Sequence, residues 1–227
     1  MFETELSLQM KFIELKEKNK KDNESILSEF NARFGNVDIV EVVISDDNLL
    51  NFNQANVLSN YQHARVLAYL HKKAARTYSY LKKSTDYTEK SLSDTLSKLI
   101  KAKIIEEISG KKYVIATEFQ FPHLQFISYE AKLQKWKKAV LQATINKKFS
   151  SYSYVVLPYD LAFRLHRQEL NCFETFNIGL IGVTDEEFFY FYNPPKKSVS
   201  VSINPSLITS IAKFQLETST FQKPGLA

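Results

Sequence analysis

The sequence predicts an α/β fold in which a mixed sheet is flanked by helices and interrupted by an inserted helical domain. Three observations lead to this prediction. A run of β-branched residues from Val37 to Ser45 is typical of a buried strand. A strand, an amphipathic helix and a second strand follow one another from Phe126 to Pro158. Between these segments, residues 57–117 change to helical periodicity and end in two short strands.

Composition limits the classes of protein to consider. The chain has 227 residues, a net charge of +5, five glycines and a single cysteine, Cys172. One cysteine excludes an internal disulfide framework and a cysteine-based zinc cluster, and so few glycines leave little room for a phosphate-binding loop. The N-terminus lacks an apolar core of the signal-peptide type, and no segment is apolar enough to cross a bilayer. We therefore expect a soluble cytoplasmic protein without a membrane partner.

The first part of the chain is expected to be helical and then extended. In the stretches "SLQMKFIELKEK" and "ESILSEFNARF", apolar residues lie three and four positions apart, so Leu6–Phe34 is predicted to be mostly helical. Gly35 and Asn36 indicate a turn, and the β-branched run after them is the predicted strand. The polar stretch "DDNLLNFNQ" then separates this strand from the inserted block.

The inserted block ends in the most regular pattern of the chain. Thr88 is a suitable N-cap, and a helix is predicted over Ser91–Ala102. Leu92, Leu96 and Leu99 share one face of this helix. The stretches "KIIEEI", "SG" and "KKYVIA" then predict a strand, a tight turn and a returning strand.

Helices followed by a two-stranded wing make residues Val57–Thr117 resemble winged-helix domains of bacterial and archaeal regulators. The resemblance rests on the order of the elements and places the helix Ser91–Ala102 in the recognition position. Lysine and arginine outnumber aspartate and glutamate in this block. The resemblance implies DNA contacts from Lys98, Lys101 and Lys103; a solvated helical surface is the alternative reading.

The strand "LQFISYEAKL" carries a carboxylate and an ammonium group in apolar surroundings. Glu130 and Lys132 are two residues apart, so they project from the same face of a strand. Charges in such surroundings are costly without a partner or a function. A carboxylate that binds a divalent cation, beside a lysine that orients water or stabilises charge, suits phosphodiester hydrolysis. The bare tripeptide is also compatible with a surface ion pair.

The helix after this strand has two separate stripes in "QKWKKAVLQATINKK". One stripe is apolar and packs on the sheet, and the other is polar and contains Lys135, Lys138 and Gln142. An ordinary amphipathic helix with a solvated face remains the alternative. The later stretch "FNIGLIGVTDEEFFYFY" predicts another pair of strands, and the tail "TFQKPGLA" is expected to be irregular.

A metal site for Mg²⁺ or Mn²⁺ needs a second carboxylate, because these cations prefer oxygen ligands. Asp38 interrupts the apolar strand "GNVDIVEV" and is the first choice. Asp46, Asp47 and Glu118 remain open as replacements. Glu41 is a weaker choice, because it points away from Asp38 on a strand.

Together these residues resemble the PD-(D/E)XK nuclease superfamily. Its pattern is an acidic residue on one strand, Glu-x-Lys on the next, and a helix that often bears glutamine. Here the pattern corresponds to Asp38 in "GNVDIV", Glu130 and Lys132 in "YEAKL", and Gln142 in "AVLQAT". Glu29 corresponds to the helical glutamate of the branch similar to Holliday-junction resolvases and RecB-type nucleases.

The resemblance implies a restriction-endonuclease-like domain made of residues 1–47 and 119–227, into which a winged-helix domain of residues 48–118 is inserted. It also implies metal-dependent DNA cleavage. Asp38 and Glu130 would hold the metal, with Lys132, Gln142 and Glu29 as further site residues, and Lys135 and Lys138 would contact DNA. A DNA-binding protein that keeps the nuclease fold only as a scaffold, and a protein-interaction module, are the alternatives. Homodimerisation is left open.

Overall fold

A computed structural model describes residues 2–32, 35–45 and 48–221 of the chain. The chain forms two compact units, each made of two separate segments. The first unit contains residues 1–45 and 124–199, and the second contains residues 46–123 and 200–227. Residues 46–123 of the second unit therefore lie between the two segments of the first. Among the described residues, no helix is long and apolar enough to cross a membrane.

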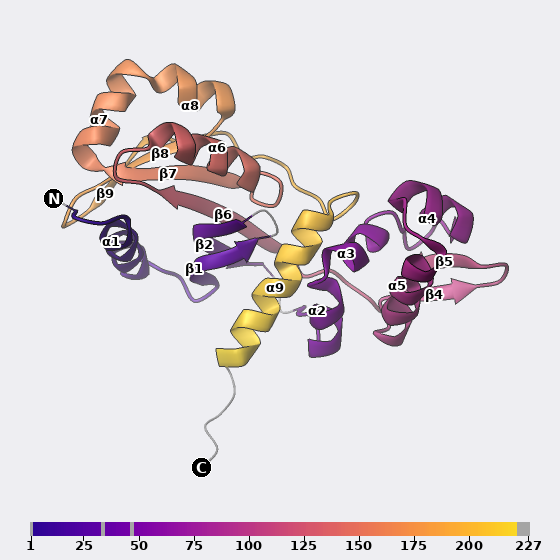
Figure 1. Cartoon of the computed structure of the whole chain (residues 1–227). Coiled ribbons are helices and arrows are strands. Elements are labelled where there is room, and N and C mark those ends of the chain that lie inside the picture. Colours follow the sequence, from indigo (N-terminus) through magenta and orange to yellow (C-terminus); the bar gives the residue numbers. More distant parts are fainter. Residues whose placement is uncertain (1, 33–34, 46–47, 222–227) are drawn as a thin grey trace, which may run out of the picture. The chain divides into compact units, whose positions relative to one another are not determined.

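The first unit is built on a mixed sheet with the strand order β1-β2-β6-β7-β8-β9 in the described part of the chain (Figure 1). Strands β1, β2 and β6 are antiparallel neighbours, β6, β7 and β8 run parallel, and β9 returns antiparallel to β8. This sheet confirms the predicted α/β class. The strands are β1 (Glu24–Ala32), β2 (Gly35–Ile44), β6 (Leu124–Ala131), β7 (Tyr152–Pro158), β8 (Gly179–Val183) and β9 (Phe188–Tyr192).

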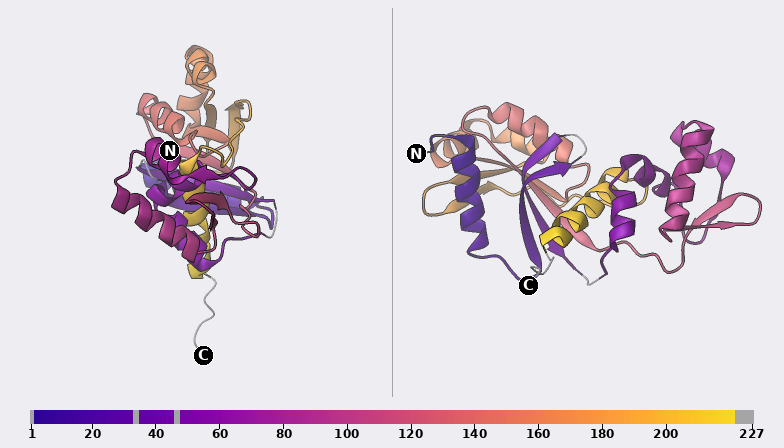
Figure 2. Two further views of the ribbon diagram at one scale, coloured as in Figure 1. Left: turned by 90° about the vertical axis from the view of Figure 1, so that its right-hand side faces the viewer. Right: turned by 60° about the horizontal axis from the view of Figure 1, so that its bottom comes forward.

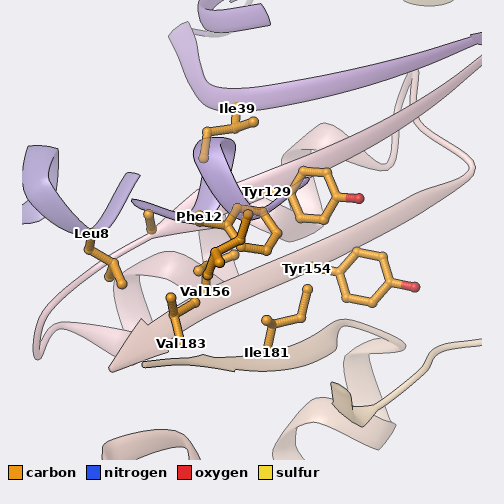
Figure 3. Packing of buried hydrophobic residues seen from close by; sticks show 10 residues of the cluster. Leu8, Phe12, Ile39, Tyr129, Tyr154, Val156, Ile181 and Val183 are labelled. Atoms are coloured by element: carbon orange, nitrogen blue, oxygen red, sulfur yellow. The ribbon is translucent and has the colours of Figure 1, made fainter. Parts of the chain in front are cut away.

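Helix α1 (Glu5–Glu17) covers one face of this sheet, and α6 (Trp136–Asn146) lies on the other (Figures 1 and 2). Leu8 and Phe12 of α1 are fully buried against residues of four strands. In Figure 3 the rings of Tyr129 and Tyr154 lie side by side at the border of this cluster, and their centroids are 5.4 Å apart. Burial of this apolar surface holds α1 on the sheet.

The opposite face is covered by α6, α7 (Tyr159–Gln168) and α8 (Leu170–Phe176). Ala139 and Ala143 of α6 pack directly on Val155 and Leu157 of β7. Small residues on the buried stripe of α6 let the helix approach the strands closely. The sheet is thus covered by helices on both faces.

The predicted helix over Leu6–Phe34 is right for its first half and wrong for its second. Residues 5–17 form α1, but residues 24–32 form β1, which pairs along its length with β2. The spacing of Ile26, Leu27 and Phe30 fits a helix and also fits this strand, because Glu29 has a left-handed backbone (φ 51°) within the strand. The pairing of these residues with β2, and not their local spacing, determines that they form a strand.

The second unit combines helices with a small antiparallel sheet of strand order β3-β5-β4. Helix α5 begins at the predicted cap, since Thr88 Oγ1 accepts a hydrogen bond from the backbone nitrogen of Ser91. Leu92, Leu96 and Leu99 are buried, as predicted. The elements are α2 (Phe52–Leu58), α3 (Tyr61–Leu67), β3 (Arg76–Thr77), α4 (Tyr78–Thr85), α5 (Glu89–Lys101), β4 (Ile105–Ile108) and β5 (Lys112–Ile115).

The C-terminal helix α9 (Pro205–Phe221) belongs to the second unit and lies beside α2 (Figure 2). The predicted domain boundaries had placed residues 119–227 in the first unit, so the division differs there. Leu207, Ile208 and Ile211 of α9 are buried. Their apolar surface is covered by α2 and α3. Most of the tail that was expected to be irregular lies outside the described residues.

Candidate active site

Glu29 and Asp38 lie on the paired strands β1 and β2. The register pairs Ser28 with Ile39 and Phe30 with Val37, so Glu29 and Asp38 occupy the position between these two pairs. The left-handed backbone of Glu29 interrupts the ladder at this point.

Asp38 and Glu130 lie opposite each other across β2 and β6. The last pair of that ladder joins Ile39 to Tyr129, and the next position in the same register places Asp38 opposite Glu130. Asp38 on β2 and Glu130 on β6 therefore face each other on the same side of the sheet, and the charge of Glu29 on β1 acts on Glu130. More than ninety residues separate Asp38 from Glu130 in the sequence, and the inserted unit accounts for most of this separation.

Asp38 is held by two hydrogen bonds from the Glu-x-Lys segment. Its Oδ2 accepts from the backbone nitrogen of Ala131 at 2.8 Å and from Lys132 Nζ at 2.7 Å. Lys132 Nζ also donates to the carbonyl oxygen of Ala131 and lies 3.6 Å from Glu5 Oε2. Asp38 and Lys132 are both buried, so this ion pair is only weakly screened by solvent.

Glu130 is 1% exposed and uses only one of its two carboxyl oxygens. Oε1 accepts a hydrogen bond from Asn146 Nδ2 at 2.7 Å, whereas Oε2 is buried and has no hydrogen-bond partner among the described residues. Burial, followed by the negative charge of Asp38, raises the pKa of Glu130 from 4.5 to about 7. The hydrogen bond from Asn146 and the charge of Lys132 oppose this rise, and Glu29 adds to it.

Lys132 remains protonated at neutral pH. Burial acts to lower the pKa of its ammonium group, but the hydrogen bond and charge of Asp38, together with Glu5 and Glu130, outweigh burial and raise the pKa. Lys132 is therefore a fixed positive charge and a hydrogen-bond donor. It is not suited to act as a general base.

Of the other predicted residues, Glu29 joins the site and Gln142 does not contact it. Glu29 lies on a strand and not on a helix, contrary to expectation, and its charge still acts on Glu130. Gln142 lies on α6 as predicted, but its amide oxygen is buried without a hydrogen-bond partner among the described residues. Lys135 and Lys138 are exposed at the start of α6.

Asn146 is the residue that the sequence analysis missed. It is the last residue of α6 and is buried. Its carbonyl oxygen accepts from Ser150 Oγ, which continues into a buried hydroxyl network with Ser128 and Ser153. This network fixes the end of α6 against β6 and β7, and thereby fixes the amide that holds Glu130. The available signal in the sequence was its position three residues after Ala143, on the apolar stripe of the predicted helix.

The carboxylates considered as replacements for Asp38 do not lie beside Glu130 in the described part of the chain. Glu41 faces the α1 side of the sheet, where its Oε2 accepts from Tyr129 Oη at 2.5 Å and pairs with Lys16 Nζ at 2.6 Å. Glu118 is exposed in the second unit. Asp46 and Asp47 lie outside the described residues. Asp38 remains the natural partner of Glu130.

Two carboxylates of this site could hold a small divalent cation. Among the described residues, no group of three or more histidine, cysteine, aspartate or glutamate side chains is arranged to hold a metal ion. Mg²⁺, however, is commonly held by one or two carboxylates, with water and substrate phosphates completing its coordination. Asp38 and Glu130 could supply such a pair, and Oε2 of Glu130 is buried without a hydrogen-bond partner among the described residues.

The second unit exposes the three lysines predicted to contact DNA. Lys98 and Lys101 lie on the solvent side of α5, and Lys103 follows that helix with a left-handed backbone (φ 56°). Lys98 borders a polar hollow between α3 and α5, together with Lys90, Asp94 and Thr88. The exposed side of α5 therefore carries three lysines, Lys90, Lys98 and Lys101, together with Glu89 and Asp94.

Comparisons of the chain with protein families, curated proteins and solved structures find no match.

Proposed function

We propose that the first unit hydrolyses phosphodiester bonds in DNA with the help of Mg²⁺ or Mn²⁺, and that the second unit binds DNA. The observation that carries this proposal is the state of Glu130: a buried carboxylate with one free oxygen and a pKa of about 7, beside Asp38 and Lys132. Strongly perturbed carboxylates cluster at functional sites.

A purely structural role explains these residues less well. An ion pair between Asp38 and Lys132 alone would tie β2 to the end of β6. It gives no reason for a third charged group, Glu130, with a buried oxygen that lacks a partner. Such an oxygen typically costs on the order of 1–3 kcal/mol of stability. A site that binds a cation and a phosphate gives that oxygen a function.

The order of the elements supports the resemblance to the PD-(D/E)XK superfamily. Asp38 lies on β2, Glu130 lies on the neighbouring β6 and Lys132 follows that strand, and α6 comes directly after them. In the second unit the order α3, β3, α4, α5, β4, β5 is consistent with a winged helix whose recognition helix is α5. The restriction-endonuclease-like fold and the winged-helix insertion are both part of the proposal.

Each residue of the site has a role in this chemistry. A bound cation would polarise the scissile phosphate and lower the pKa of a water molecule. Asp38 and Glu130 would hold that cation, with Glu130 kept in place by Asn146. Lys132, protonated and fixed by Asp38, would stabilise the negative charge that develops on the phosphate. Glu29 would add negative charge that favours cation binding.

The test is cleavage by the purified protein. Linear duplex, flapped, single-stranded and four-way-junction DNA should be incubated with Mg²⁺ or Mn²⁺, with Ca²⁺, and with EDTA. We expect cleavage with the first two cations only, since Ca²⁺ prefers a larger and more flexible coordination shell. Glu130→Gln should abolish cleavage and leave DNA binding unchanged. Lys132→Ala should reduce it by roughly 10²–10⁴-fold, the usual value of such a group.

Lys18→Ala is the matched control for Lys132, because Lys18 is an exposed lysine paired with Glu14 on α1. Its cleavage rate should equal that of the wild type. Melting temperatures of all variants separate loss of function from loss of folding. Binding without cleavage of any substrate would favour the scaffold alternative, and absence of both binding and cleavage would favour a protein-interaction module.

A further inference from the structure

A hollow of about 230 Å³ in the first unit gathers three lysines and is distinct from the carboxylate site. We call it the lysine hollow; Lys147, Lys196 and Lys197 line it, together with Ser151, Tyr152 and Asn177. None of the described residues that line it is aspartate or glutamate. Positive charge is therefore concentrated there without an anionic side chain to neutralise it.

Two of the ammonium groups are held in fixed positions. Lys147 Nζ donates to the carbonyl oxygen of Phe176 at 2.7 Å, and Lys197 Nζ donates to the carbonyl oxygen of Lys147 at 2.6 Å. An ammonium group has three donor hydrogens, so each of these groups retains donors for a ligand. A charge that is already positioned loses less conformational entropy when it binds.

The backbone that carries Lys196 and Lys197 is also restrained. It follows Pro194 and Pro195, whose rings fix the backbone angle φ. The backbone nitrogen of Lys197 donates to the carbonyl oxygen of Ser151 at 2.9 Å, next to the first residue of β7. The segment is therefore attached to the chain at the start of β7, a central strand of the sheet.

Capping of helix ends accounts for only part of this charge. Lys147 bonds the last carbonyl of α8, and Lys197 bonds the C-terminal residue that caps α6. A helix C-terminus carries at most about half a negative elementary charge. Two such ends offset about one of the three positive charges, so the hollow retains a surplus. Burial, followed by the positive charge of Lys197, lowers the pKa of Lys147, as expected for cations held close together.

From this arrangement we propose that the lysine hollow binds a phosphate group. Its volume is below the roughly 300–1,000 Å³ of typical small-molecule pockets, which suits a single small anion. Lysine binds phosphate as a point charge, and Ser151 and Asn177, which also line the hollow, carry neutral hydrogen-bond donors.

The inference rests on the lysine hollow alone and does not require cleavage by the carboxylate site. The phosphate can belong to a small molecule or to a nucleic acid backbone, and two measurements on the full chain separate these sources. In the first, inorganic phosphate is titrated into isotope-labelled protein and backbone amide resonances are followed by NMR. We expect saturable shifts at Ser151, Tyr152 and Lys197 that equal concentrations of chloride do not produce.

In the second measurement, binding of a single-stranded thymidine oligonucleotide is followed by fluorescence anisotropy at several salt concentrations without a divalent cation. The double variant Lys147→Gln, Lys197→Gln should lower the salt slope of binding by about 0.7 per lost phosphate contact. The matched control is Lys18→Gln, Lys20→Gln, which makes the same change in charge at two lysines paired with Glu14 and Glu17. This control should leave the slope unchanged.

Saturable phosphate shifts without a change in salt slope would assign the hollow to a small phosphate-bearing molecule. Shifts together with a reduced slope would assign it to nucleic acid. Absence of both effects would overturn the proposal. Since Lys147→Gln removes a helix-end hydrogen bond, Lys196→Gln serves as a second variant, and it should weaken phosphate binding without lowering the melting temperature. A protein that binds phosphate but does not cleave DNA would support this inference and contradict the proposed function. A protein that cleaves DNA but does not bind phosphate would do the opposite.

Discussion

Asn146 donates a hydrogen bond to Glu130 across 2.7 Å and leaves the second oxygen of that carboxylate without a partner in the described residues. This bond links the end of α6 to the centre of the sheet. It orients Glu130 and also favours its ionised form, because an amide donor stabilises a carboxylate more than a carboxylic acid. Asn146 is therefore a positioning residue for the proposed site.

Asn146→Ala should raise the pKa of Glu130 above its value of about 7, because the hydrogen bond that lowers it is lost. Since a carboxyl group binds a cation only after losing its proton, Mn²⁺ binding should move to higher pH. Carboxyl-carbon NMR of Glu130 measures the pKa, and calorimetry at several pH values measures Mn²⁺ binding. Gln134→Ala is the control, because Gln134 is an exposed amide before α6; it should change neither the pKa of Glu130 nor the pH dependence of Mn²⁺ binding. A purely structural Asn146 would lower stability without moving the pKa.

Glu29→Gln should have the opposite effect on Glu130. The negative charge of Glu29 contributes to the raised pKa, so its removal should lower the pKa of Glu130 below about 7. The decrease should be smaller than for Asp38→Asn, because Asp38 is the stronger of the two charges acting on Glu130. The same NMR titration measures both variants, with Glu24→Gln on the same strand as control. An unchanged titration in Glu29→Gln would remove Glu29 from the site.

Much of the fold follows from local pattern. The strand over residues 37–45, the helix after Thr88 and the strand–helix–strand from 126 to 158 are each close to the observed elements, because their periodicity and caps are local. Strand β1 was missed, because its apolar spacing fits a helix and only pairing with β2 selects the strand. Helix α9 was assigned to the wrong unit, since a mostly apolar helix does not specify which partner covers it.

Part of the candidate site is also predictable from local sequence pattern, and part depends on tertiary packing. Asp38, Glu130 and Lys132 were selected because charged residues interrupt apolar strands, and the structure brings them together. Asn146 was missed and Gln142 was chosen instead, although both are amides of α6. The choice between them depends on how the end of α6 is fixed on the sheet by Ser128 and Ser150, which is tertiary information.

Replacing Lys98, Lys101 and Lys103 with alanine should weaken DNA binding at all sequences alike. Each lost phosphate contact should reduce the salt slope of duplex binding by about one. Fluorescence anisotropy at several salt concentrations measures this slope. Lys82→Ala is the matched control, because Lys82 is paired with Glu89 at 2.6 Å and precedes α5. Unchanged affinity and slope in the triple variant would indicate that the second unit docks on protein.

Lys132→Met should destabilise the first unit by about 3 kcal/mol, since it leaves the buried Asp38 carboxylate without its cation. Asp38→Asn in the same chain should restore part of this loss, and the two substitutions should differ from additivity by roughly 0.5–3 kcal/mol. The free energy of unfolding of each variant is measured by urea unfolding. The fluorescence of Trp136 reports on the first unit, because the single tryptophan lies there. Strict additivity would show that the two charges do not interact.

Glu130 should make the first unit less stable as the pH rises. Its pKa is about 7 in the folded protein against an ordinary 4.5, so between these values the folded state binds the additional proton. The stability that this proton contributes is present at low pH and is lost as the pH rises through about 7. The full effect is on the order of 3 kcal/mol for a carboxyl group as buried as this one. Glu130→Gln cannot ionise and should be free of this loss.

The difference in unfolding free energy between Glu130→Gln and the wild type should therefore grow from pH 5 to pH 8 in favour of the variant. Trp136 fluorescence in urea at each pH follows the first unit, and Glu106→Gln, at an exposed position in the second unit, is the control. Saturating Mn²⁺ should reduce the difference, because a cation that binds the ionised carboxylate of the folded wild type stabilises it by mass action. A difference that stays constant with pH would mean that Glu130 is ionised throughout, and that its free oxygen is stabilised by a group other than a proton.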